Sequence, residues 1–243
     1  MMAEREAEEE EAAARVARNA SPINSLPWLV WLVILAITGI ELALWLGGRG
    51  LIGGAGAVGW RLEALQRFGF STSLQAWMLD SLRFPALHLV RYPAFSFVHT
   101  GPLHAFFVVV LIAALGKAYG EAQGAIRLFL MMFLPAILGA VAFGLILGEN
   151  ESGWLFGGMA MVFGLVGGLT WHRWHVAEDR GAQIRAFGII GTLLLARLAV
   201  GLMVEVGHGW VAELAAFAIG FGLAAGMGPG RWAQIRARLL ERG

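Results

Sequence analysis

The most constraining feature of this sequence is a predominantly apolar run of about 20 residues from Pro27 to Leu46. At a rise of about 1.5 Å per residue, a helix of this length crosses the roughly 30 Å hydrocarbon core of a bilayer. The run is also too long for the core of an ordinary signal peptide. We therefore predict an uncleaved membrane-spanning helix that begins at Pro27 and ends at Gly47 and Gly48.

The composition of the whole chain also indicates a lipid solvent. Of its 243 residues 58% are hydrophobic and only 14% are charged, and the mean hydropathy is +0.68. A single soluble core of this size does not need so much apolar side chain. The formal charge of +1 gives no reason to expect nucleic acid as a partner, and the absence of cysteine excludes disulfides and thiolate chemistry. We predict an integral membrane protein.

Five more apolar segments follow the first, and we predict an all-α bundle of six membrane-spanning helices. The later spans are expected at about 100–116, 127–147, 155–171, 186–204 and 210–227. Between the first and second spans lies a long mixed loop, residues 47–97, in which Leu74–Leu89 has the spacing of an amphipathic interfacial piece.

The distribution of charged residues divides the chain into three parts and predicts its orientation in the membrane. We predict an acidic tail over 1–26, the membrane domain over 27–228 and a basic amphipathic tail over 229–243. With the N-terminus inside, the inner segments hold 12 lysines and arginines, against five in the long first loop. By the positive-inside rule both termini are cytoplasmic, and we expect a bacterial inner membrane protein whose partners include membrane lipid.

The residues that open the second predicted span are similar to a known family pattern. Residues 91–104 read R-Y-P-A-F-S-F-V-H-T-G-P-L-H, and this segment resembles the start of the second helix of rhomboids. The rhomboid pattern is W-R followed by F-x-H-x-x-x-x-H-x-x-x-N, and Arg91, Phe97, His99 and His104 fall at the matching spacings. Six helices, an inside N-terminus and a long first loop also resemble the rhomboid core.

This resemblance implies which residues would carry chemistry, and three of them are changed. Active rhomboids use a serine of G-x-S-G on the fourth helix, a histidine on the sixth, and the asparagine and second histidine of the second helix at the oxyanion. At the matching positions this chain has Met159 for the serine, Glu213 for the base and Val108 for the asparagine, and it retains His104. A thioether has no proton to lose and forms no acyl-enzyme.

The resemblance therefore implies a rhomboid pseudoprotease, in the manner of derlins, with no catalytic residues. Its expected role is to bind transmembrane segments of partner proteins or to serve as an accessory membrane subunit, without a cofactor. Matching glycines at Gly157, Gly164 and Gly220, together with Gly168 and Gly226, are expected to let the fourth and sixth helices pack closely.

Two other readings of the sequence stay open. Ser152 also fits an S-G-x-x-F-G pattern, so a shallow Ser152–His208 dyad would make an active intramembrane serine protease. Arg197 and Glu213, as charges within apolar spans, are the sole sign of a small transporter.

Polar residues in the predicted bundle allow further expectations. His99 and His104 are about 140° apart around a helix, so a metal site is not expected, and His99 should cap the start of its helix. Glu213 is expected in a polar cavity, paired with Arg197 or His104. For Glu41 we expect a salt bridge or an end-of-helix position that only fixes packing.

Overall fold

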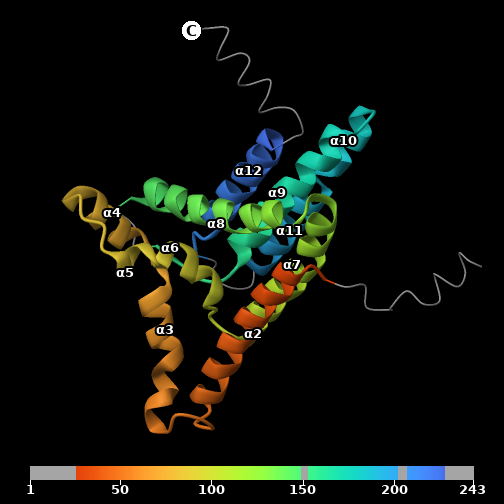
Figure 1. The fold of residues 1–243 in the computed structure, drawn as a ribbon. Helices are drawn as coiled ribbons and strands as arrows, with labels where there is room; N and C mark the ends of the chain where they lie inside the picture. The colour runs from red at the N-terminus through yellow and green to blue at the C-terminus, as the bar shows by residue number, and fades with distance from the viewer. Residues whose placement is uncertain (1–25, 149–152, 202–206, 228–243) are drawn as a thin grey trace, which may run out of the picture.

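The computed structural model describes residues 26–148, 153–201 and 207–227, and within them the chain is almost wholly helical (Figure 1). Three helices are long and apolar enough to cross a membrane: α2 (Trp28–Gly48), α7 (Pro102–Gln123) and α8 (Ala125–Leu147). Shorter helices stand where the last three spans were predicted: α9 (Met159–His175), α11 (Gly188–Gly201) and α12 (Trp210–Gly226). The helical class is confirmed, whereas the count of six spans stays a prediction.

The link between the second and third long helices differs from the sequence prediction. Residues 117–127 were expected to form an inner loop, but α7 continues to Gln123 and a single residue, Gly124, separates it from α8. Gly124 has a φ of +82°, which a glycine adopts without steric cost. An ion pair at helical spacing, Lys117 to Glu121 at 3.9 Å, accompanies the extra turns of α7.

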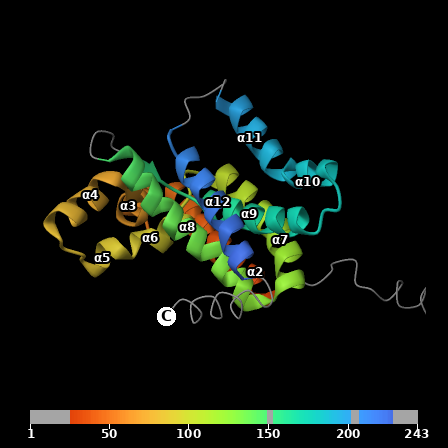
Figure 2. The ribbon, with the colours of Figure 1, turned by 90° about the horizontal axis from the view of Figure 1, so that it is seen from above.

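The long first loop folds into a chain of short helices that lies to one side of the bundle (Figure 2). Its elements are η1 (Ala55–Gly59), α3 (Trp60–Phe68), α4 (Thr72–Ser81), α5 (Ala86–Leu89), α6 (Arg91–Ala94) and η2 (Phe95–Phe97). The single amphipathic piece expected over Leu74–Leu89 is wrong. Leu82 ends α4 in the left-handed region with φ 52°, and Pro85 disfavours helical geometry in the residue before it.

A two-residue sheet ties this lateral arm to the segment before α9. Strand β1 (Phe70–Ser71) pairs antiparallel with β2 (Trp154–Leu155). Two bonds extend the junction: the Thr72 amide donates to the Gly153 carbonyl at 3.0 Å, and the Gly153 amide donates to the Thr72 hydroxyl at 2.9 Å. The arm and the start of α9 therefore hold each other in place.

Helix α9 lies at the centre of the core, with every residue from Ala160 to Trp171 buried. It packs against α7, α8 and α12, while α10 (Arg180–Ala186) and α11 cover a further side (Figure 2). A helix that is hydrophobic all round suits this fully enclosed position.

Glycines let the backbones of α9 and α12 touch. A Cβ at Gly220 would overlap the Gly164 carbonyl, and one at Gly167 would overlap the Phe217 carbonyl. Gly164 and Gly220 were expected at this contact, whereas Gly167 was not. Gly168 instead faces Tyr119 and Met131, and Gly226 has open space around it, so the packing role expected for Gly226 is wrong.

We predict that Gly220→Ala lowers stability by about 1–3 kcal/mol, because the added methyl meets backbone that cannot move aside. The matched control is Gly222→Ala on the same helix, where a Cβ meets nothing within 4 Å. Thermal unfolding of both variants in detergent checks the difference. Equal midpoints would contradict the close contact of α9 with α12.

Candidate functional site

A cavity of about 210 Å³ opens where α9 and α12 begin, and we call it the recess. Its walls come from segments far apart in the sequence. They include Phe95, Thr100 and His104; Trp154, Leu155, Phe156, Gly157, Met159 and Ala160; and Gly207, Gly209, Ala212 and Glu213.

The recess brings together three of the residues singled out from the sequence. Met159 is the first residue of α9, Glu213 lies in the first turn of α12, and His104 lies in the first turn of α7. Glu213 is buried, with 6% of its surface exposed. Val108 is buried one turn below His104, where its side chain packs against Gly158, and it is not part of the recess wall.

The floor of the recess requires glycine at position 157. Gly157 has a φ of +84°, and a Cβ there would lie 2.5 Å from Cε1 of His104. The His104 ring therefore packs directly on the backbone. Its Nδ1 is 3.3 Å from the Thr100 hydroxyl, a residue that the sequence analysis did not single out.

His99 supports the floor from below and does not cap the helix. It is fully buried, its Nε2 accepts a hydrogen bond from the Gly158 amide at 3.3 Å, and its ring centroid is 5.1 Å from that of His104. Gly101 precedes the first residue of α7, Pro102, and no side chain caps this helix, so the predicted capping role of His99 is wrong. An acceptor Nε2 places the proton of the neutral ring on Nδ1.

Burial lowers the pKa of His99 to about 4. Burial is the largest cause of this value, which also includes a lowering of the pKa by the neighbouring His104 and Arg61 and a smaller opposing effect of a backbone hydrogen bond at Phe97. The ring is therefore neutral at physiological pH and keeps its Nε2 acceptor.

Arg61 on α3 joins this support to the first long helix. Its guanidinium donates to the His99 carbonyl at 2.8 Å and to both carboxylate oxygens of Glu41, at 3.1 and 2.5 Å. Glu41 thus forms a salt bridge in a largely buried position, with 10% of its side chain exposed. A salt bridge is one of the expectations for Glu41, but its partner Arg61 could not be predicted from the sequence, because nothing in a separation of 20 residues links the two.

The other residues that match the family pattern hold the arm and the start of α7. Arg91 donates to the Gly69 carbonyl at 2.8 Å, just before β1. Phe97 stacks on Phe133 of α8, with ring centroids 6.1 Å apart. Both contacts are structural and neither residue lines the recess.

The alternative site residues fall partly outside the described structure. Ser152 lies outside the described residues, and so does the side chain of Arg197. The expected ion pair between Arg197 and Glu213 therefore also lies outside the described part of the structure. His208 is exposed just before α12; its neighbours Gly207 and Gly209 line the recess, while His208 does not. Within the described ranges, no group of three or more His, Asp or Glu side chains is placed to hold a metal ion.

Comparison with known families identifies the class of protein. The model of the rhomboid domain matches residues 87–230, which is more than half of the chain and includes every segment of the recess. The chain therefore belongs to the rhomboid family. Its apolar helices agree with the membrane location of such proteins. Among curated proteins, no significant match is found.

We predict that acid destabilises this protein through His99. The pKa of this ring is about 4 in the folded chain and 6.5 in the unfolded chain, so the unfolded state takes up the proton first as pH falls. Its contribution to stability is complete above pH 6.5 and is lost as pH falls towards 4, by about 3 kcal/mol at most.

The measurement is the free energy of unfolding in detergent between pH 7 and pH 4. His99→Gln, whose amide oxygen can accept the Gly158 hydrogen bond, should flatten this dependence, whereas His208→Gln at an exposed position should not. The same acid dependence in His99→Gln and the parent chain would show that His99 is not the group responsible.

Proposed function

We propose that this chain is a catalytically inactive, rhomboid-like membrane protein whose recess binds a transmembrane segment of a partner protein. We also propose the six-span bundle of the family for it, in a bacterial inner membrane with both termini cytoplasmic. The observation that carries the proposal is the position of Met159. The thioether stands on the recess wall at the first residue of α9, beside His104 and Glu213, where no proton can be removed to make a nucleophile.

The backbone beside the recess supports the absence of catalysis. An oxyanion hole needs amide donors that are free to meet developing charge. The Gly157 amide already donates to the Phe95 carbonyl at 2.8 Å, and the Gly158 amide donates to His99. Both donors are therefore committed to holding the loop before α9.

The size and lining of the recess suit part of a helix. The recess measures about 210 Å³, which is below the roughly 300–1,000 Å³ of a typical small-molecule site. A client segment would therefore insert one or two side chains. Aromatic walls at Phe95 and Phe156 suit an apolar body, and Glu213 and His104 suit a side chain that carries a hydrogen-bond donor.

The first prediction concerns catalysis, measured by labelling with a serine-reactive fluorophosphonate beside an active rhomboid. We expect no labelling of this chain. We also expect none of Met159→Ser, because Glu213 stands at the position of the base and Val108 at that of the asparagine. Labelling that is lost in Ser152→Ala or in Thr100→Val would contradict the proposal and would identify the nucleophile.

The second prediction concerns the client. A photoreactive amino acid at Trp154, which is 43% exposed at the recess, should crosslink in cells to an apolar, span-length segment of another protein. Met159→Trp fills the recess and should reduce the crosslink several-fold, whereas Leu145→Trp at an exposed site on α8 should not. Crosslinks that are equal in the two variants would show that clients do not use the recess.

A further inference from the structure

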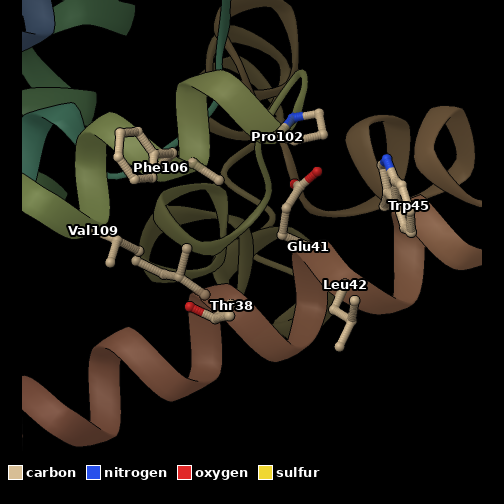
Figure 3. A pocket seen from close by; sticks show the side chains of 9 residues that line it. Thr38, Glu41, Leu42, Trp45, Pro102, Phe106 and Val109 are labelled. Carbon is tan, nitrogen blue, oxygen red and sulfur yellow. The ribbon is translucent and has the colours of Figure 1, made fainter.

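A second hollow lies between α7 and α2 (Figure 3). It measures about 290 Å³, and we call it the groove. Its lining is almost entirely apolar and includes Ile37, Thr38, Leu42 and Trp45 from α2 and Phe106 and Val109 from α7.

The groove opens onto a surface that meets lipid. Both of its helices are long and apolar enough to cross a membrane. Its lining includes exposed apolar groups, among them Leu42 at 53% and Phe106 at 59%. In a bilayer such a surface contacts acyl chains, so the groove is reached from the hydrocarbon core.

The shape of the groove favours a narrow, flexible occupant. From Ile37 to Trp45 it follows α2 for about 12 Å, at about 1.5 Å per residue. Its volume of about 290 Å³ is at the lower end of the roughly 300–1,000 Å³ found for small-molecule sites. An acyl chain lies along such a groove, while a partner helix would rest on its rim.

One end of the groove carries a positive charge at the end of the apolar helix. Helix α2 stops at Gly48, and the exposed Arg49 places its guanidinium 4.4 Å from the centre of the Trp45 ring. Trp45 is part of the groove wall, so a phosphate at Arg49 would sit directly above an acyl chain in the groove. Tryptophan and arginine at such a boundary are suited to lipid headgroups.

The one acidic group in the groove does not oppose an anion. The Glu41 carboxylate points between α2 and the start of α7 (Figure 3), but both of its oxygens accept from Arg61. This pair is neutral in sum, which leaves Arg49 to set the charge at the mouth of the groove.

We propose that the groove is a binding site for an anionic phospholipid, with one acyl chain between α2 and α7 and the phosphate at Arg49. This site shares no lining residue with the recess. Because Arg61 also holds the His99 carbonyl, the lipid would brace the same contacts that support the floor of the recess.

The test uses phosphatidylglycerol with a diazirine on one acyl chain, as a minor component of phosphatidylcholine nanodiscs that hold the full chain. Mass spectrometry of the labelled peptides should place the crosslinks at Phe106 and Val109. Thr38→Trp fills the groove and should reduce this labelling several-fold. Leu35→Trp, one turn away on the same helix and outside the groove, should leave it unchanged.

The headgroup is tested with Arg49→Gln, which should weaken labelling by phosphatidylglycerol about fivefold, the effect of one cation near an anionic lipid. The matched control is Arg67→Gln, an exposed arginine that also lies over a ring, Phe68, but is outside the groove. Folding of each variant is verified by its thermal unfolding midpoint. On α7, the pair Val109→Trp and Val110→Trp repeats the comparison of a tryptophan inside the groove with one outside it.

Three results would overturn the proposal. Equal labelling of Thr38→Trp and Leu35→Trp would mean that only bulk lipid passes over the groove. Equal labelling of Arg49→Gln and Arg67→Gln would show that the lipid headgroup does not bind at Arg49. With a photoreactive amino acid at Phe106, crosslinks to a second copy of the chain in place of lipid would show that a second copy covers the groove.

Discussion

The direct backbone contact between α9 and α12 is the constraint on which the rest of this structure depends. Because Gly164 and Gly220 have no side chains, the two helices approach until a methyl group at Gly220 would overlap a carbonyl. This approach places Met159 and Glu213, at the starts of the two helices, on the wall of one small recess. It also leaves α9 enclosed from Ala160 to Trp171, so the apolar surface of this stretch contributes to the core.

A second set of contacts, a series of hydrogen bonds, connects the first long helix to the recess. Glu41 on α2 binds Arg61 on α3, Arg61 binds the His99 carbonyl, and the His99 ring accepts from Gly158 beside the recess. Each link is a hydrogen bond in a largely apolar setting, where an unpaired partner is costly. The long first loop is thus a structural part of the recess even though it contributes few of its walls.

The recess and the groove lie in the same helical bundle but differ in the chemistry of their linings. The recess is small, polar on one side and bounded by the Gly157 and Gly158 amides, which already donate to other groups of the chain. The groove is apolar and faces the surface of the two long helices, which suits an acyl chain.

The sequence by itself determined that the apolar helices are suited to lipid, that the fold is helical, where the long helices lie and which family the chain resembles. These features depend on apolar length and local spacing, which are properties of neighbouring residues. It also named Met159, Glu213 and His104, whose meeting at one recess followed from the family pattern. Only the tertiary structure decided the role of His99, the Glu41–Arg61 pair, the two-residue sheet and the groove between α2 and α7. These features join residues with no periodic relation in the chain. The interactions therefore form, and contribute to stability, only when distant segments pack together.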